Sequence, residues 1–469
     1  MKTFQGLGAF ALLFSWPGLS FAAMPDGNQL PVAWGIPFAG LLLSIALLPL
    51  LAPAWWHRHF GKVTAAWSLA FLLPFAVLYG PRMAAFSLVH ALLAEYLPFI
   101  VLLTALYTVA GGIHIRGHLR GSPGLNTAIL AIGAVLASFM GTTGASMLLI
   151  RPLIRANDQR LRRVHVVVFF IFIVSNAGGS LTPLGDPPLF LGFLNGVDFF
   201  WTARHIFPET LFLVASLLVI FYALDAWLYR RDRLLPQDPT PDTRRIGFDG
   251  AANFWLLGGV AGLVLLSGFW KSPVVFNLAG TLVGLPGLVR DAGLVAITLL
   301  SLNITSAKVY ADNQFSWAPM LEVAKLFAGI FLTIVPVIAM LKAGAGGPFG
   351  AVVASVTRLD GTPDPAMYFW ATGVLSSFLD NAPTYLVFFN TAGGDPQALM
   401  TTLAPTLAAI SAGAVFMGAN TYIGNAPNLM VRAIAEDRGV KMPSFFGYML
   451  WSGGVLIPLF VLMTFIWFH

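Results

Sequence analysis

Residues 182–188 read Thr-Pro-Leu-Gly-Asp-Pro-Pro, and residues 421–427 read Thr-Tyr-Ile-Gly-Asn-Ala-Pro, 239 positions later (421 − 182 = 239). A second pair of stretches has the same offset: Leu-Ala-Ser-Phe-Met at 136–140 resembles Leu-Ser-Ser-Phe-Leu at 375–379 (375 − 136 = 239). One such match in an apolar chain can arise by chance. Two matches at one offset indicate an internal duplication, so the sequence predicts a fold built from two related halves.

The composition excludes water as the main solvent of this chain. Hydrophobic residues make up 57% and charged residues 10% of the 469 residues, whereas soluble proteins carry about 25% charged residues. Apolar stretches at 32–52, 211–228, 253–270 and 448–468 are each close to the roughly 20 residues that cross a bilayer as a helix. We therefore expect an all-α membrane protein with about 10 transmembrane helices.

Charge and cysteine content exclude several other classes of protein. The net charge of +6 and the pI near 9.6 arise from short basic clusters between apolar stretches, and these clusters form no basic face of the kind that binds nucleic acid. The absence of cysteine excludes disulfide bonds and thiolate metal sites. We expect no cofactor, and the expected partners are membrane lipid and small ions or a small carboxylate.

Five clusters of Lys and Arg lie between the apolar stretches, at 57–62, 114–120, 151–163, 230–245 and 432–441. Loops that remain in the cytoplasm are enriched in Lys and Arg. All five clusters are therefore expected on the cytoplasmic side of a bacterial-type inner membrane.

This orientation requires two re-entrant hairpins. The stretch 124–150 has a cytoplasmic cluster at each end, so it must enter and leave the membrane on one face. The stretch 364–392 must do the same from the outer face if 432–441 is to reach the cytoplasm. Corresponding hairpins with opposite openings indicate inverted repeats, which are typical of secondary transporters.

The same reasoning divides the chain into parts. A polar, Pro-containing linker at 230–250 separates an N-terminal half, 24–229, from a C-terminal half, 251–469. Residues 1–23 combine Lys2, an apolar run and small residues at their end, as a signal peptide does. An uncleaved first helix is the alternative, and it leaves the rest of the topology unchanged.

Four Gly- and Pro-rich stretches interrupt the apolar segments: two hairpin tips at 141–146 and 380–384, and two helix breaks at 175–188 and 418–428. Non-helical backbone at membrane depth survives only inside protein or along a water-filled cavity. The free N–H and carbonyl groups of broken helices suit anions and cations respectively, although their polar neighbours can also act only as caps. The candidate residues for ion or substrate binding are Thr142, Thr143, Ser146, Ser175, Asn176, Thr182, Asp186, Asp380, Asn381, Thr384, Asn420, Thr421 and Asn425.

Asp186 and Asp380 lie in the interrupted segments, one in each half. A charge at the bilayer centre costs at least about 2.5 to 3.5 kcal/mol, so each carboxylate is expected to hold a proton or a cation, with helix capping as the alternative. Glu95 and Glu322 precede the two hairpins and are further candidates for proton coupling, although Glu322 and Lys325 can pair on one helix face. A Na⁺ site is predicted at Asp380, Asn381, Asn176 and Asn420.

The motifs resemble those of a known group of transporters. The stretches SNAGGSLTPLGDPP at 175–188, LDNAPT at 379–384 and GANTYIGNAPNLM at 418–430 resemble the ion transporter superfamily. Within it, they are similar to the citrate-transporter-like (CitMHS) branch close to the sodium/proton antiporters of the NhaD type. The resemblance implies a scaffold domain, a transport domain with two re-entrant hairpins and two discontinuous helices, elevator-type movement and a homodimer.

The hairpin tips decide between the functions that this resemblance allows. Carboxylate-transporting relatives usually present Ser-Asn-Thr at both tips, whereas here the tips read Gly-Thr-Thr-Gly and Asp-Asn-Ala-Pro-Thr. The second form is more typical of cation antiporters and metalloid efflux relatives. The broken segments also contain two Asp and no basic residue, and Arg151 beyond the first tip is expected to be a cytoplasmic anchor.

The favoured function is therefore Na⁺ (or Li⁺)/H⁺ antiport, without enzymatic activity. The main alternatives are Na⁺- or H⁺-coupled transport of citrate or another dicarboxylate, and metalloid efflux. A channel is a weaker alternative because a channel has no need of two inverted halves. An intramembrane aspartyl protease that uses Asp186 and Asp380 as a proton-sharing pair is the most remote, because such a pair does not explain two hairpins.

Overall fold

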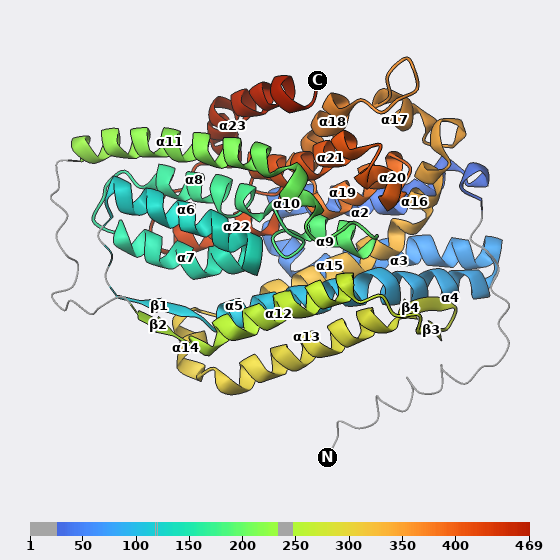
Figure 1. Ribbon diagram of the computed structural model, residues 1–469, viewed down its shortest axis with the longest axis horizontal. Coiled ribbons are helices and arrows are strands. Elements are labelled where there is room, and N and C mark those ends of the chain that lie inside the picture. The colour runs from blue at the N-terminus through green and yellow to red at the C-terminus, as the bar shows by residue number, and fades with distance from the viewer. Residues whose placement is uncertain (1–25, 118, 120, 233–246) are drawn as a thin grey trace.

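The computed structural model describes residues 26–117, 119, 121–232 and 247–469 (Figure 1). The predicted signal peptide or first helix at 1–23 lies outside the described residues. The same is true of residues 233–246 of the predicted linker. The two halves can be followed separately on either side of that linker.

The N-terminal half consists of helices and one short strand. In chain order these elements are η2 (Gly27–Gln29), η3 (Val32–Gly35), α2 (Ile36–Leu51), α3 (Pro53–Tyr79), α4 (Pro81–His90), the π-helical segment η4 (Ala91–Tyr96), α5 (Leu97–Gly111), β1 (His114–Arg116), α6 (Pro123–Met140), α7 (Thr142–Ala156), α8 (Val164–Ile173), η5 (Ala177–Gly179), α9 (Pro187–Leu194), α10 (Trp201–His205) and α11 (Phe207–Arg231).

The C-terminal half has a similar make-up. Its elements are β2 (Gly247–Asp249), α12 (Ala252–Phe269), β3 (Val275–Leu278), β4 (Thr281–Gly284), α13 (Leu285–Ile304), α14 (Ala307–Asp312), α15 (Ala318–Thr333), α16 (Val335–Lys342), η6 (Gly344–Gly346), α17 (Gly350–Ser355), α18 (Pro365–Phe378), α19 (Asn381–Thr391), α20 (Pro396–Met400), α21 (Ala404–Met417), η7 (Gly418–Asn420), α22 (Ala426–Asp437) and α23 (Phe445–Trp467). Strands occur only as two antiparallel pairs in the described chain, β1 with β2 and β3 with β4.

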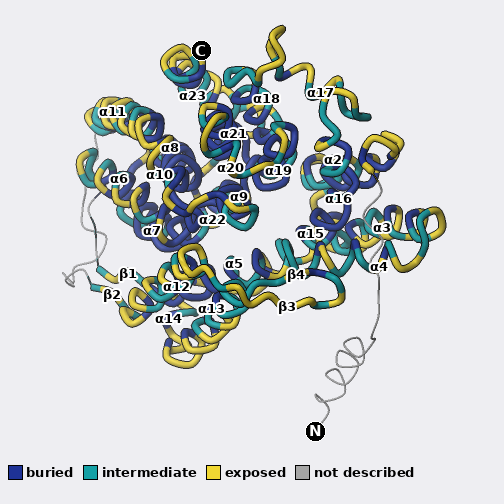
Figure 2. Tube along the Cα trace, turned by 45° about the vertical axis from the view of Figure 1, so that its right-hand side comes forward, coloured by how far each residue is buried: buried dark blue, intermediate teal, exposed yellow. Residues whose placement is uncertain are grey.

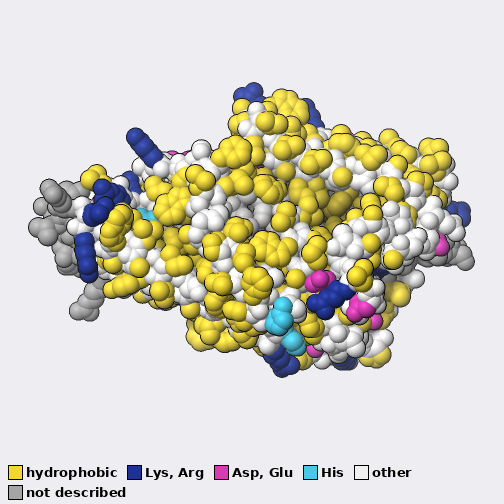
Figure 3. All heavy atoms as spheres, turned by 90° about the horizontal axis from the view of Figure 1, so that it is seen from above, with side chains coloured by type: hydrophobic (Ala, Val, Ile, Leu, Met, Phe, Trp, Pro, Cys, Tyr) yellow, Lys and Arg dark blue, Asp and Glu magenta, His cyan; other side chains and the backbone are white. Residues whose placement is uncertain are grey.

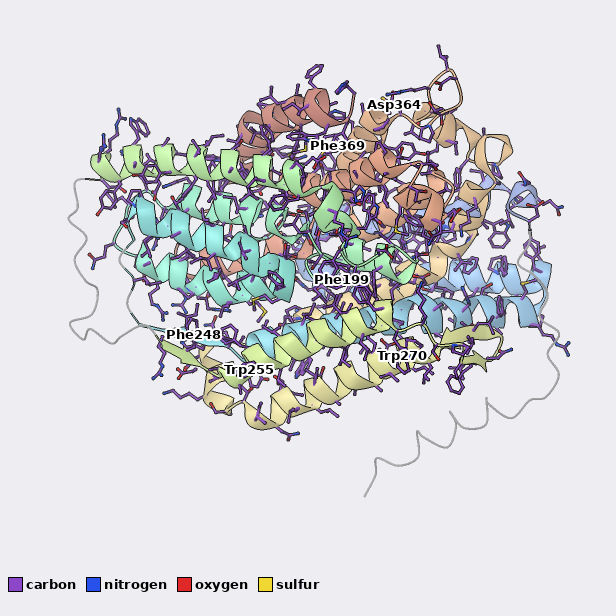
Figure 4. All side chains as sticks on the ribbon, in the orientation of Figure 1. Phe199, Phe248, Trp255, Trp270, Asp364 and Phe369 are labelled. Atoms are coloured by element: carbon purple, nitrogen blue, oxygen red, sulfur yellow. The ribbon has the colours of Figure 1, made fainter. Side chains whose placement is uncertain are left out.

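The helices are long and apolar enough for a multi-pass membrane protein, which confirms the predicted fold class. Within the described ranges, eight helices could cross a membrane by length and composition, or nine if α15 and α16, bent by 41° at their junction, form one span. Hydrophobic side chains cover most of the face seen in Figure 3. Trp255 of α12, 85% exposed, projects away from its helix in Figure 4 and needs an apolar neighbour such as lipid.

One predicted loop is part of a helix. The basic cluster at 57–62 was expected between two spans, but it lies in the first turns of α3, which follows α2 after the single residue Ala52. Helix α3 is 27 residues long, about 40 Å at 1.5 Å per residue. That length exceeds the thickness of the hydrocarbon core, about 30 Å. The charged first turns of α3 can therefore lie at the membrane–water interface.

Two hydrophobic cores divide the molecule into two lobes, which Figure 2 shows around their buried residues. The hairpin lobe contains α6, α7, α8, α11, α18, α19, α21, α22 and α23. The flanking lobe contains α2, α3, α4, α5, α12, α13, α15 and α16. Helix α9 joins them, because Leu189 packs in the first core and Leu191 in the second.

The hairpin lobe takes its name from two pairs of packed helices. Helices α6 and α7 lie side by side (Figure 1) and are joined at Gly141, whose φ of +81° favours glycine. Helices α18 and α19 pack together after Leu379 and Asp380, and the Asp380 side chain caps α19. The predicted hairpins at 124–150 and 364–392 thus fall on helix pairs, at 123–156 and 365–391.

Candidate functional site

The predicted helix breaks are present in both halves. Helix α8 ends at Ile173 and the chain resumes as α9 at Pro187, while α21 ends at Met417 and α22 begins at Ala426. A proline occupies one of the first two positions of α9 and of α22. Proline suits that position because its fixed φ is helical and its missing N–H would have no partner there.

Corresponding residues at the two breaks make the same hydrogen bonds. Thr182 Oγ1 donates to the Ser138 carbonyl oxygen, and Thr421 Oγ1 donates to the Ser377 carbonyl oxygen. Both pairs are related by the offset found in the sequence (421 − 182 = 239 and 377 − 138 = 239). In each half, therefore, a threonine of the broken segment is attached to the first helix of the neighbouring hairpin.

Close backbone contacts explain the paired glycines of the breaks. A Cβ atom at Gly185 would lie 2.1 Å from the Gly179 carbonyl oxygen, and one at Gly424 would lie 2.5 Å from the Gly418 carbonyl oxygen. Real Cβ atoms do not approach backbone oxygens so closely. At each break, therefore, two backbone segments cross in close contact, and a residue larger than glycine would push them apart.

Asp186, only 1% exposed, is the residue on which these segments converge. Its Oδ2 accepts a hydrogen bond from Asn381 Nδ2 at 2.6 Å. Its Oδ1 accepts from Thr142 Oγ1 at 3.1 Å and from Asn425 Nδ2 at 3.4 Å. The two hairpin tips and the second break thus all donate to one carboxylate of the first break.

A second layer of amides holds these donors in place. Asn425 Nδ2 also lies 3.2 Å from the Ser175 carbonyl oxygen and 3.3 Å from Asn176 Oδ1. Asn176 in turn donates to Asn428 Oδ1 at 2.8 Å. The Ser146 and Ser175 hydroxyls are 2.8 Å apart. Buried amides with satisfied hydrogen bonds fix a single arrangement of side chains, so the site is preorganised around Asp186.

Two buried amide oxygens of the predicted site lack a partner among the described residues, and one of them belongs to Asn381, which contacts Asp186. Asn381 Oδ1 and Asn420 Oδ1 are buried and accept no hydrogen bond from the described residues. Their amide nitrogens are used, because Asn381 donates to Asp186 and Asn420 Nδ2 donates to Ser377 Oγ at 2.9 Å. A buried acceptor without a donor needs a water or an ion, and amide oxygens are ligands for hard cations.

A pocket of about 100 Å³ reaches Asp186 from the space between the lobes. Its walls are the first hairpin tip and the first break on one side, α5 and α15 of the flanking lobe on the other, and the start of α22. Asp186 and Tyr107 are the ionisable residues that line it, and no Lys, Arg or His does so in the described chain. A water needs about 10 to 15 Å³ by this measure, so the pocket has room for a small hydrated ion.

Other predicted residues lie near this centre without touching Asp186. Thr143 lines the pocket. Thr384 Oγ1 donates to the Asp380 carbonyl oxygen at 3.0 Å, and Asp380 Oδ1 accepts from the Ala382 N–H at 3.1 Å. This geometry matches the capping role that was the alternative for Asp380. Its role as an ion ligand stays a prediction.

The predicted pair of Glu322 and Lys325 is wrong. The part of the chain that the structure describes has no ion pair between them, and the Lys325 ammonium lies 5.3 Å from the centroid of the Phe60 ring instead. Helix α15 packs against α3, and this packing places the Phe60 ring of α3 close to the Lys325 ammonium. Glu95 lies in the π-helical segment η4, with a buried Oε2 that has no partner among the described residues.

Sequence reasoning missed a buried charged network at the base of the first hairpin. Asp225 of α11 forms ion pairs with Arg160 at 2.5 Å and with His165 at 2.7 Å, and it accepts from Asn126 Nδ2 at 2.9 Å. Arg160 belongs to the cluster at 151–163 that was expected in the cytoplasm, but it is buried, as His165 is. The available signal was Asp225 itself, a carboxylate inside the apolar stretch 211–228.

The described residues offer no set of side chains that suits a transition metal. No group of three or more His, Cys, Asp and Glu that could hold a metal ion occurs within the described ranges. The oxygens around Asp186 come instead from one carboxylate, amides and hydroxyls. The donor set therefore suits an alkali cation or a proton better than zinc or iron, which favour imidazole and thiolate.

A family of known proteins matches most of the chain. A protein-family model described as “Putative citrate transport” matches residues 27–468, which is 442 of the 469 residues (468 − 27 + 1 = 442). None of the curated proteins compared with the chain matches it. The match extends across both hairpins and both helix breaks.

Proposed function

The chain belongs to the “Putative citrate transport” family and is a multi-pass membrane transporter, and from this premise we propose that it exchanges Na⁺ or Li⁺ for H⁺. The observation that carries the proposal is the lining of the pocket, where Asp186 is the only carboxylate and no basic residue accompanies it in the described chain. A cation or a proton neutralises such a group. Citrate would bring further negative charge to it.

The proposed mechanism is competition for Asp186. A carboxylate in an apolar pocket is costly when it is charged and alone, so it holds either a proton or a metal cation. Thr142, Asn381 and Asn425 keep the carboxylate in one orientation through their hydrogen bonds. The unpartnered oxygen of Asn381, whose amide nitrogen contacts Asp186, supplies a further cation ligand. Because the two cargoes exclude each other, each crosses the membrane in exchange for the other.

The change of access is proposed to come from the inverted halves. The shared offset of 239 residues relates the threonine contacts, the glycine crossings and the starts of α7 and α19 (381 − 142 = 239). Two halves with opposite orientations can exchange conformations and open one site to either face. The separate cores of the two lobes support a movement of the hairpin lobe against the flanking lobe, in a homodimer in the bacterial inner membrane.

A second candidate is Na⁺- or H⁺-coupled transport of citrate or another dicarboxylate. The description of the matching family favours it. The chemistry of the pocket opposes it, because recognition of carboxylates commonly uses Arg or Lys. The two functions therefore differ in whether the pocket attracts a cation alone or a cation together with an anion.

Proton movement in inverted vesicles separates the candidates. Vesicles from a bacterial strain without its own antiporters are energised, and a fluorescent dye reports collapse of the proton gradient after addition of Na⁺, Li⁺, K⁺ or citrate. We expect collapse with Na⁺ or Li⁺, and its loss in Asp186→Asn. Uptake of labelled citrate without any response to cations would refute the antiport proposal.

Asp380→Asn refines the assignment in the same vesicles. Asn caps a helix about as well as Asp does, so this substitution removes the charge and keeps the cap of α19. Loss of exchange in this variant would assign Asp380 to the ion path. Retention would leave it the capping role that its contact with Ala382 indicates.

A further inference from the structure

Arg151 occupies the face of α7 that looks toward the pocket. Thr143, Met147 and Arg151 are spaced four residues apart, so they follow one another on one side of the helix. Thr143 lines the pocket. Met147 packs against Tyr107 and Met320 of the flanking lobe. Arg151 comes next along this face, beyond the apolar cluster and in the contact between the two lobes.

Its guanidinium contacts the flanking lobe, while its predicted role as a cytoplasmic anchor stays a prediction. Arg151 Nη2 donates to Gln314 Oε1, in the loop before α15 of the flanking lobe, at 3.3 Å. The Nε and Nη1 atoms are buried and have no hydrogen-bond partner in the described chain. The side chain therefore bridges the two lobes, with two of its nitrogens buried and its contact with Gln314 open to solvent.

No carboxylate neutralises this charge directly. The described residues include no ion pair with Arg151. Asp437, the last residue of α22, and Arg438, which follows it, are within electrostatic range of Arg151 and carry opposite charges. Other basic residues of the same cluster are engaged: Arg160 pairs with Asp225 and Arg163 pairs with Asp158. Arg151 thus carries a positive charge without an ion-pair partner in the described chain, about two helical turns beyond Thr143 and outside the lining of the pocket.

We propose that Arg151 determines the cation specificity of the Asp186 pocket by opposing divalent cations more strongly than monovalent ones. This inference rests on the proposed function, since it requires a cation at Asp186. The Coulomb energy between Arg151 and a bound ion is proportional to the charge of that ion. A fixed arginine charge beside a pore is a general electrostatic barrier to cations.

The size of the effect follows from the length of helix between the two groups. Thr142 contacts Asp186, and Arg151 is nine residues later (151 − 142 = 9), about 14 Å along a helix. At an effective dielectric constant of about 20, one charge at this distance changes the affinity for a monovalent ion by about eightfold. For a divalent ion the factor is the square, about sixtyfold.

Neutral and charge-conserving variants of Arg151 test the proposal. Arg151→Gln and Arg151→Met remove the charge, and Arg151→Lys keeps it. Arg162→Gln is the matched control, because Arg162 belongs to the same basic cluster but its side chain is 52% exposed and its charge is screened by salt. The measurements are the half-maximal Na⁺ concentration for proton movement in inverted vesicles, and the Ca²⁺ concentration that halves the response when Na⁺ is kept well below the half-maximal concentration of each variant, where Ca²⁺ inhibition reports Ca²⁺ affinity alone.

We expect both neutral variants to need less Na⁺, by up to about eightfold, and to be inhibited by Ca²⁺ at concentrations lowered by roughly the square of that factor. Arg151→Lys and Arg162→Gln should stay within about twofold of the wild-type protein. Gel filtration of each purified variant checks that it is folded. If one neutral variant is unstable, the other gives the result.

Two results would overturn the proposal. Equal factors for Na⁺ and Ca²⁺, or weaker binding of both, would show that Arg151 acts through the local structure and not through its charge. An unchanged half-maximal Na⁺ concentration in the neutral variants would show that its charge does not reach the pocket. A wild-type protein without any cation response would instead refute the antiport function itself, so the two failures are distinguishable.

Discussion

The two hairpins are alike at their tips and different at their bases. At the tips, Thr142 and Asn381 occupy corresponding positions (381 − 142 = 239), and both donate to Asp186. At the base of the first hairpin, Asp225 of α11 contacts Arg160 and His165. Both tips donate hydrogen bonds to the same carboxylate, Asp186, and are therefore constrained to the same geometry. The two hairpin bases have no residue that both of them contact in this way.

The base of the second hairpin uses a neutral contact. The position that corresponds to Asp225 is Thr464 of α23 (464 − 225 = 239), whose hydroxyl accepts a hydrogen bond from Trp370 Nε1 at 3.0 Å. A buried ion pair leaves an uncompensated charge when it separates, while a neutral hydrogen bond can be exchanged at a cost of about 1 kcal/mol. The comparison implies that the first hairpin is joined more firmly to its neighbouring helix than the second.

The largest expected effect comes from removing the ion pair between Asp225 and Arg160. Asp225→Asn leaves Arg160 buried with its nearest carboxylate removed, which typically costs about 3 to 5 kcal/mol. Thr464→Val, its counterpart in the other half, should cost only about 1 kcal/mol. Thermal unfolding of the purified protein in detergent should show a drop in Tm several times larger for Asp225→Asn. Equal drops would mean that the two bases are attached with similar strength.

The site offers a second asymmetry, because only one half supplies the central carboxylate. The residue that corresponds to Asp186 is Asn425 (425 − 186 = 239), and its Nδ2 is 3.4 Å from Asp186 Oδ1. Asp186→Asn should reduce Na⁺-dependent proton movement at least about a hundredfold, on the scale of losing one electrostatic partner in a dry site. Asp186→Asn combined with Asn425→Asp moves the charge to the neighbouring position.

We expect the double variant to recover part of the exchange, because the pocket regains one carboxylate close to its original place. The half-maximal Na⁺ concentration and the maximal response in vesicles measure the recovery. Asn425→Asp alone is the control, since it places two carboxylates together. The double variant can remain folded and yet be as inactive as Asp186→Asn. In that case exchange requires the carboxylate at the position of Asp186 in the first break, and a carboxylate at the neighbouring position does not replace it.

The sequence was sufficient to predict the order of the main helices. Apolar length and loop charge predicted helix pairs near 124–150 and 364–392, and the offset of 239 residues predicted which segments correspond. That these pairs re-enter the membrane stays a prediction, since α6 alone is long and apolar enough to span it. Both signals are strong because the bilayer sets the length of a span and the cytoplasm retains basic loops. The predicted count of about ten spans stays a prediction, since length and composition alone select eight or nine helices within the described ranges.

The partners of individual charges could not be predicted in the same way. Arg160 and Arg151 stand in one basic cluster of the sequence, yet one pairs with Asp225 and the other lies between the lobes. Lys325 contacts Phe60 rather than Glu322. These partners are far apart in the chain, and tertiary packing alone brings them together. For Asp186, in contrast, its place in an interrupted apolar segment was enough to single it out, although not to predict which donors surround it, and its role in transport stays a prediction.

The smallest expected effect concerns a single donor at one tip. Thr142→Val keeps the shape of the side chain and removes the hydrogen bond to Asp186, which is 3.1 Å long in the structure. A hydrogen bond to a charged group contributes at least about 1.5 kcal/mol, so we expect the half-maximal Na⁺ concentration to rise by at least about tenfold. Thr142→Ser keeps the hydroxyl and should restore it. Because Thr142 and Asn381 are counterparts, an effect confined to Asn381→Leu would show that one tip holds the carboxylate and the other only covers it.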